Sequence, residues 1–234
     1  MSAAGGTISL LVGTVLLRLT VTGAYTRYVQ SRMGPWLVVA GVVVIALGAA
    51  TLVRAAKPTR SRPRTGRVHD HFGGENERVG WLLLAPIAAL LLVAPPALGS
   101  FGVDRGASVD VREGAPEFQP LDPAAGPVDM TLLEYSQRAF DHDGASLGDT
   151  PVRLTGFVAG GGFRLARYQI ACCAADAAPV VVRVVGTHGD PPARDQWVTV
   201  TGTFRPGDGA GEGDVAQLAA TSVLEIPEPA DPYE

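Results

Sequence analysis

The sequence predicts a two-part chain, membrane α plus all-β: three transmembrane helices followed by an extracytoplasmic, OB-like, five-stranded β-barrel domain. Three observations lead to this fold class. Residues 1–100 contain three apolar segments, each near the roughly 20 residues that cross a bilayer core. The net charge changes sign along the chain: residues 1–99 carry 10 Lys or Arg against 3 Asp or Glu, and residues 100–234 carry 9 against 20. From residue 150 onward, short apolar runs alternate with turn-rich segments.

The predicted spans are residues 8–28, 35–53 and 80–100. Pro35 suits the first turn of a helix, and Trp36 and Trp81 suit a membrane interface. Buried helices of a soluble core are the alternative, but the rest of the chain is too small to wrap three such segments. A cleavable signal peptide is disfavoured because no basic residue precedes residue 8 and two further spans follow.

The positive charge predicts the orientation of these spans. The loop 54–79 holds seven basic residues, whereas the first connection holds two, Arg27 and Arg32. The positive-inside rule therefore places the N-terminus and this loop in the cytoplasm, beside anionic lipid headgroups, and residues 101–234 outside. The loop also carries His69 and His71, which are too few ligands for a structural zinc site.

Arg18 lies near the middle of the first predicted span, where an arginine costs about 2.5–3.5 kcal/mol to insert. No Asp or Glu occurs in residues 1–69 to neutralise it. Arg18 therefore either reaches lipid phosphate or faces an acid or a carbonyl of a second membrane protein. Small and hydroxylated residues would suit close packing against such a partner; they are Thr20, Thr22, Gly23, Gly41, Gly48, Ala49 and Ala50.

The outer part begins with residues 101–128, which are rich in Pro, Gly and acidic residues and predict an extended linker. The domain proper is predicted to span 129–234. Its first element is a short helix over 132–140, because Thr131 and Glu134 form a capping box in front of it.

Five strands are predicted to follow, over residues 151–159, 163–173, 179–186, 196–205 and 215–226. Gly156 and Gly202 occupy the same register in the related runs VRLTG and VTVTG, and a glycine inside a strand marks a bulge or bend. Five short bent strands favour an OB-like barrel, with a β-sandwich as the alternative. The net charge of −11 over residues 100–234 argues against nucleic acid as a partner, because it would repel phosphates.

Cys172 and Cys173 are the only cysteines of the chain. On a regular strand, Tyr168, Ile170 and Cys172 share one face, which looks like core, and Cys173 points to the other. A disulfide between adjacent residues fits poorly, since their Cα atoms lie about 3.8 Å apart. Three interpretations remain open: a packing and turn motif in which Asp176 bonds back to the backbone, a metal or thiol site using Cys173 with Asp176, and catalysis.

Catalysis has little support in the sequence. A cysteine nucleophile needs a nearby histidine, and the outer domain offers only His142 and His188, both in turn-rich segments. No hydrolase triad, phosphate-binding loop or metal-hydrolase motif occurs. We therefore expect no enzymatic activity and no required cofactor, with a metal ion as the ligand left open.

Several motifs together resemble the DUF1980 family, described as subunits of two-component permeases. The most specific is the run C-C-x-A-D-A at Cys172–Ala177, preceded by Arg167. The run from Trp197 to Gly202 and the closing Pro232-Tyr233 also match. The resemblance implies an accessory subunit that works beside a separate multi-span permease, with no established enzymatic activity. The histidine-rich loop common in that family is reduced here to two residues.

These observations lead to one functional hypothesis and two alternatives. The first is an accessory membrane subunit that packs against a permease and holds an acidic domain over its outer mouth to assist or gate transport. The second is a membrane-anchored extracytoplasmic module that binds a metal or a thiol ligand on its own. The third is a thiol enzyme, which predicts a rapidly alkylated Cys173.

Overall fold

The computed structural model describes residues 3–57, 96–105, 109, 111, 116–187, 189–207 and 215–234. The chain divides into two compact units. Residues Met1–Tyr25 and Ser31–Pro96 form one, called here the helical unit. Residues Thr26–Gln30 and Ala97–Glu234 form the other, called here the C-terminal domain. The short connection Thr26–Gln30 therefore belongs to the C-terminal domain, although it lies between the first two helices in sequence.

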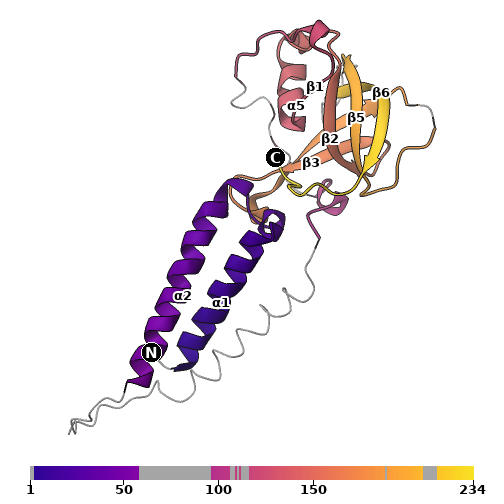
Figure 1. Ribbon diagram of the computed structural model, residues 1–234. Coiled ribbons are helices and arrows are strands. Elements are labelled where there is room, and N and C mark those ends of the chain that lie inside the picture. Colours follow the sequence, from indigo (N-terminus) through magenta and orange to yellow (C-terminus); the bar gives the residue numbers. More distant parts are fainter. Residues whose placement is uncertain are drawn as a thin grey trace. The chain divides into compact units, whose positions relative to one another are not determined.

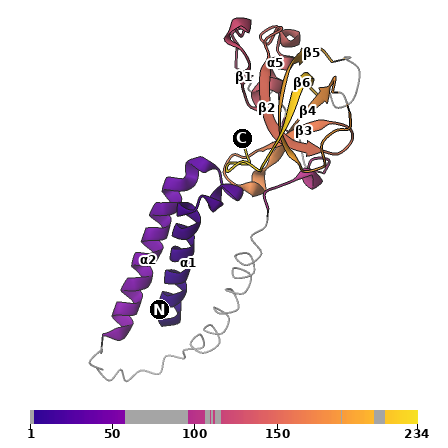
Figure 2. The same ribbon diagram turned by 45° about the vertical axis from the view of Figure 1, so that its right-hand side comes forward.

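The helical unit contains two helices that run side by side, α1 (Ala3–Val21) and α2 (Gly34–Ala56) (Figures 1 and 2). Glycines let them approach closely. A Cβ added at Gly41 would lie 2.9 Å from the Leu17 side chain, and one at Gly48 would lie 2.9 Å from the carbonyl oxygen of Gly6. We expected Gly41 and Gly48 to pack against a partner protein. They pack within the chain instead, because α1 covers that face of α2.

The first helix is shorter than the predicted span and ends at Val21. Gly23 follows it with a φ of 74°, the left-handed conformation that commonly ends a helix. Arg18 therefore lies exposed in the last turn of α1 rather than near the middle of a span. This position places the positive charge beside the negative end of the helix dipole, which favours it.

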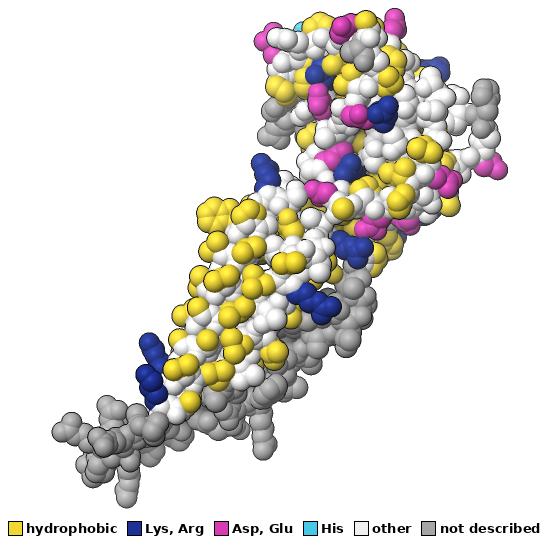
Figure 3. Space-filling model, viewed as in Figure 1, with side chains coloured by type: hydrophobic (Ala, Val, Ile, Leu, Met, Phe, Trp, Pro, Cys, Tyr) yellow, Lys and Arg dark blue, Asp and Glu magenta, His cyan; other side chains and the backbone are white. Residues whose placement is uncertain are grey.

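Among the described residues, one helical stretch, Ser31–Ala56, is long and apolar enough to cross a membrane. Its large apolar side chains are mostly exposed, unlike those of a soluble core helix; they include Trp36, Val39, Val42, Val43, Leu47 and Val53. Figure 3 shows this apolar surface over α1 and α2. The apolar part of α1, Gly5–Val21, is shorter. The basic loop beyond residue 57 and the third predicted span up to residue 95 lie outside the described residues.

The C-terminal domain is a six-stranded mixed sheet with one helix, α5 (Leu132–Phe140), packed on it (Figure 1). The strands are β1 (Val128–Asp129), β2 (Val152–Ala159), β3 (Arg164–Gln169), β4 (Ala178–Val185), β5 (Trp197–Arg205) and β6 (Gln217–Ile226). They are ordered β1-β2-β3-β4-β6-β5, and β2 also pairs with β5. The pairs β1–β2 and β4–β6 are parallel. The predicted β-sheet domain is thus confirmed, but its sheet is mixed and has six strands instead of five.

Two glycines bring neighbouring strands close together. At Gly202 the pairing of β5 with β6 shifts register, the bulge that the sequence predicts. A Cβ at Gly202 would collide with the carbonyl of Ala219, and one at Gly156 would lie 2.6 Å from the carbonyl oxygen of Ala166. Larger residues would therefore force the strands apart at both positions.

The main core lies between α5 and the sheet and includes the fully buried Leu132, Tyr135, Leu154, Leu165 and Val200. The predicted capping box is confirmed on one side: the Thr131 side chain accepts a hydrogen bond from the Glu134 amide at 3.0 Å. Residues 101–128 are not a free linker in their described parts. Val109, Val111 and Leu121 pack against this core, because apolar residues are interspersed among the prolines and acids of that segment.

Candidate functional site

The vicinal cysteines lie in the loop that joins β3 to β4, residues Ile170–Ala177, called here the site loop. Strand β3 stops at Gln169, four residues earlier than predicted, and a short 3-10 turn, Ala174–Asp176, follows the cysteines. The carboxylate of Asp176 folds this loop. It accepts hydrogen bonds from the amides of Ala171 (2.9 Å), Cys172 (2.9 Å) and Cys173 (3.3 Å). The predicted capping role of Asp176 is therefore confirmed.

Both sulfurs lie on the same side of the site loop. Cys172 Sγ and Cys173 Sγ are 3.6 Å apart, and the Cys172 thiol donates to Asp176 Oδ2 at 2.9 Å. The expectation that Cys172 points into the core is wrong: it is exposed, whereas Cys173 is half-buried. Strand alternation does not apply here, because the loop has left the sheet and the Asp176 carboxylate draws three consecutive amides toward one point.

One hydrogen bond contributes most to the charges within this cluster. The bond of Cys172 to Asp176, followed by its bond to Cys173, raises the pKa of the Cys172 thiol to about 12. The same bond, with support from the backbone amides, lowers the pKa of the Asp176 carboxyl to about 2. At neutral pH the cluster therefore holds an ionised carboxylate next to a protonated thiol. A protonated thiol is a poor nucleophile.

The donor atoms fit a small thiophilic cation. The ligand atoms of Cys172, Cys173 and Asp176 all lie within 4.8 Å of one another. A tetrahedral Zn²⁺ with bonds of about 2.3 Å to sulfur holds two sulfurs about 3.8 Å apart, close to the 3.6 Å found here. The sulfur–carboxylate separation of 2.9 Å would have to widen by about 0.6 Å. Two thiolates and a carboxylate favour a borderline or soft divalent ion over Mg²⁺ or Ca²⁺.

A second core cluster lies next to the site loop, at the same end of the sheet. It contains the buried side chains of Phe157, Tyr168, Ile170, Trp197 and Tyr233. The Phe157 ring stacks on Tyr168 with centroids 5.8 Å apart and meets Trp197 edge-on at 5.6 Å. Tyr168 and Ile170 are thus core residues, as their place on the predicted strand indicates.

Arg167 holds residues 231–234 against this cluster. Its guanidinium donates to the carbonyl oxygens of Asp231 (2.7 Å) and Tyr233 (3.3 Å). It also lies 3.8 Å from the Glu234 carboxylate, whose side chain is only 3% exposed. Arg167 makes these contacts with the chain end, and none with the Cys172–Cys173–Asp176 cluster is recorded among the described residues. We therefore assign it a structural role.

The connection Thr26–Gln30 lies against the site loop, which the sequence did not predict. Val29 pairs with Cys173 in an antiparallel bridge. The amide of Ala174 donates to Tyr28 O at 2.8 Å, and the amide of Gln30 donates to Cys172 O at 3.1 Å. The Gln30 side chain adds a bond to Ile170 O at 3.1 Å. The available signal was the run after Gly23, too short to identify as a strand but containing Tyr25, Tyr28 and Val29.

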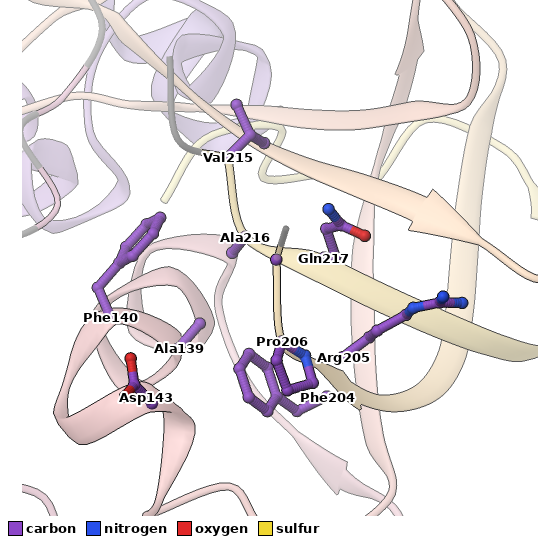
Figure 4. Close-up of a pocket in the computed structure, with 10 residues that line it drawn as sticks. Ala139, Phe140, Asp143, Phe204, Arg205, Pro206, Val215, Ala216 and Gln217 are labelled. Atoms are coloured by element: carbon purple, nitrogen blue, oxygen red, sulfur yellow. The ribbon is translucent and has the colours of Figure 1, made fainter. Parts of the chain in front are cut away.

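A separate pocket of about 370 Å³ lies between the C-terminal end of α5, the C-terminal end of β5 and the N-terminal end of β6. Figure 4 shows Phe140 on one side and Phe204 with Pro206 on the other, while Arg205 points away. None of the predicted site residues lines it. The structure thus brings Cys172, Cys173 and Asp176 together, with Arg167 on the adjoining strand. Arg18 belongs to the helical unit.

Comparison with known families gives matches over most of the chain. The DUF1980 N-terminal domain matches residues 6–105, and the DUF1980 C-terminal domain matches residues 149–234, which include the site loop. No curated protein and no solved structure matches the chain.

Proposed function

The chain belongs to the DUF1980 family, and from that premise we propose that it is an accessory membrane subunit that binds a thiophilic divalent cation in its C-terminal domain. The observation that carries the proposal is the cluster of Cys172, Cys173 and Asp176, with three ligand atoms within 4.8 Å of one another at the surface. The spacing of the two sulfurs, 3.6 Å, suits the bond lengths of a tetrahedral Zn²⁺.

The cluster favours an exchangeable ion over a structural one. Structural zinc sites are closed by four protein ligands, and three donors leave one position for water or for a donor from another protein. Cys172 and Asp176 are both exposed, so an incoming ligand reaches the ion. Such a site suits capture and transfer of a cation, which is the task of an accessory subunit beside a permease.

The chemistry also supports the expectation that the chain is not a thiol enzyme. Activation of a cysteine requires a neighbouring base or a lowered pKa. The ligand cluster contains no histidine, and its carboxylate raises the pKa of Cys172 instead of lowering it.

We propose three membrane spans, on the following support. The connection Thr26–Gln30 and the residues from Ala97 onward form one compact unit, so they lie on the same side of a membrane. If α2 crosses the membrane, the chain must cross again between residues 57 and 97 to rejoin that unit. The charge of the loop 54–79 then puts this loop in the cytoplasm and the C-terminal domain outside.

The topology can be tested with single cysteines in a background that lacks Cys172 and Cys173. We expect a membrane-impermeant maleimide to label Ser222→Cys in intact cells, since Ser222 is exposed on β6. Ser61→Cys should be labelled only after permeabilisation. Labelling of both in intact cells contradicts the proposed arrangement.

We also propose that the sheet closes into an OB-like barrel. The support is that β2 pairs with β3 on one side and β5 on the other, so β2, β3, β4, β6 and β5 follow one another in a ring of pairings. An experimental structure of the chain with an open edge at β2 or β5 would exclude this.

The cation site is tested by equilibrium dialysis of the purified full chain against Zn²⁺, followed by elemental analysis. We expect about one ion per chain in the wild type and in the control Asp129→Asn, whose carboxylate pairs with Arg153 at the surface. Cys172→Ser/Cys173→Ser should retain none and Asp176→Asn less. If the wild type binds no ion, the proposal is wrong. The Cys172–Cys173–Asp176 cluster then only forms the turn of the site loop.

The permease partner is proposed from the resemblance described above. Arg18, exposed near the end of α1, is available to an acidic side chain of that partner or to lipid phosphate. Purification in mild detergent with mass spectrometry should recover a multi-span protein, and Arg18→Leu should reduce its recovery. Isolation of the wild type as a lone species, with Arg18→Leu unchanged in insertion, contradicts the partnership.

A further inference from the structure

Apart from the Ile170 amide, which donates to Glu234 O at 3.2 Å, the backbone bonds of the site loop go to two sets of partners. The amides of Ala171, Cys172 and Cys173 donate to Asp176, within the loop. The carbonyls of Ile170 and Cys172 and the amide of Ala174 bond to the segment Tyr28–Gln30 instead. The residues that hold the thiols therefore also hold the segment.

One peptide unit belongs to both sets. The Cys172 carbonyl, which accepts from the Gln30 amide at 3.1 Å, lies in the peptide bond that joins the two cysteines. A peptide unit is planar and moves as one body. A backbone rotation at this peptide that brings the two sulfurs toward an ion therefore moves the acceptor of the Gln30 amide as well.

A bound cation requires some adjustment of this kind. The Cys172 thiol would lose its proton and its bond to Asp176, and the sulfur–oxygen distance would widen from 2.9 Å by about 0.6 Å. The sulfur pair needs little change, since its 3.6 Å spacing already suits a tetrahedral ion. The required widening thus falls between Cys172 Sγ and Asp176 Oδ2.

The other end of the connection bonds to the last residues of the C-terminal domain instead of to the site loop. Thr26 Oγ1 donates to Ala230 O at 2.6 Å, and the Tyr233 hydroxyl donates to Arg27 O at 2.9 Å. Arg27 also lies 3.6 Å from Glu228. Residues Tyr28–Gln30 are therefore the part of the connection that would move with the site loop. In sequence, the short turn Ser31–Met33 comes after them, and α2 begins at Gly34.

We propose that occupancy of the cation site is coupled to the docking of Tyr28–Gln30, and that Gln30 is the positioning residue of this coupling. The inference rests on the proposed cation site and names its regulation. A bound ion fixes the Cys172–Cys173 peptide and thereby fixes the segment that leads into α2. Because coupling between two sites is reciprocal, a docked segment also strengthens ion binding.

The first test titrates the full chain in detergent with Cd²⁺, read by the charge-transfer absorption of the Cd²⁺–thiolate bonds. Gln30→Ala removes the side-chain bond to Ile170 O and should weaken Cd²⁺ binding by about threefold. Gln30→Pro also removes the amide that bonds to Cys172 and should weaken it by about tenfold. Gln119→Ala, an exposed glutamine whose side chain makes no recorded bond among the described residues, should bind as the wild type does.

The second test measures hydrogen exchange of the amides in residues 26–33. Saturating Cd²⁺ should slow their exchange in the wild type and leave it unchanged in Cys172→Ser/Cys173→Ser. Exchange in β5 serves as the control for folding; if Gln30→Pro raises it, Gln30→Ala decides. A wild type that binds no Cd²⁺ refutes the cation site itself. Binding with unchanged exchange in residues 26–33 and undiminished affinity in both Gln30 variants refutes the coupling alone.

Discussion

Replacement of Arg167 by alanine should destabilise the C-terminal domain far more than loss of a surface ion pair. The guanidinium is 16% exposed, donates to the carbonyl of Asp231 at 2.7 Å and lies 3.8 Å from the almost fully buried Glu234 carboxylate. Removing one partner of a shielded pair leaves the other charge uncompensated, at a cost of about 3–5 kcal/mol. The variant Arg167→Ala should lose that amount of unfolding free energy.

The chain supplies a matched control on the neighbouring strand. Arg153 lies on β2 and pairs with Asp129 at 3.0 Å, but the two side chains are 41% and 72% exposed. Arg153→Ala should therefore cost less than about 1 kcal/mol. Adding Glu234→Gln to Arg167→Ala should recover about 1–2 kcal/mol, because the stranded carboxylate becomes a neutral amide.

The assay is urea unfolding of the full chain in mild detergent, followed by the fluorescence of Trp197 with the other two tryptophans replaced by phenylalanine. Trp197 is buried in the cluster beside Arg167, with the guanidinium carbon 5.8 Å from its ring centre. Equal losses for Arg167→Ala and Arg153→Ala, or no recovery in the double variant, would refute the assignment of Arg167 as the anchor of the chain end.

Three further predictions follow from particular contacts. Gly202→Ala should lower the unfolding free energy by at least about 2 kcal/mol, because the new Cβ meets strand backbone. Gly160→Ala should lower it by less than about 1 kcal/mol, because its Cβ meets the flexible end of an arginine side chain. Equal effects of the two variants in denaturant unfolding contradict this. Cys172 should react slowly with iodoacetamide at pH 7.5 and faster in Asp176→Asn, because the carboxylate raises the pKa of the thiol; a slower variant refutes it. Burial raises the pKa of the Glu234 carboxyl above its ordinary 4.5. The stability that the protonated carboxyl contributes is therefore complete below pH 4.5 and is lost as the pH rises through the raised pKa. Glu234→Gln should abolish this pH dependence of the unfolding free energy, measured from about pH 4 to 7.

Local patterns in the sequence were sufficient to place most elements of the C-terminal domain. The helix α5 begins after the predicted Thr131 cap and spans the predicted residues 132–140, and five strands coincide with the alternating runs to within a few residues. These features depend on side-chain spacing and on capping groups a few residues away, which a single stretch of sequence contains. The turn made by Asp176 is of the same kind, since its three amide donors lie within five residues of it.

The arrangement of the site depended on contacts that no local pattern encodes. Alternation placed Cys172 on the core face, and only the folded loop, leaving the sheet at Gln169, brings its sulfur to within 3.6 Å of Cys173. Gln30 and Ile170 are 140 residues apart in sequence yet share a hydrogen bond.

What the sequence determined by itself was therefore the periodicity of the elements, the charge of the two halves and the motif that carries Cys173 and Asp176, the two candidate ligands it named. The tertiary structure alone decided that both sulfurs and the carboxylate converge, and that the connection between α1 and α2 pairs with the loop that carries them. The physical reason is that periodicity specifies which face of an element is apolar. It does not specify which distant backbone will satisfy the hydrogen bonds of a loop once the strand has ended.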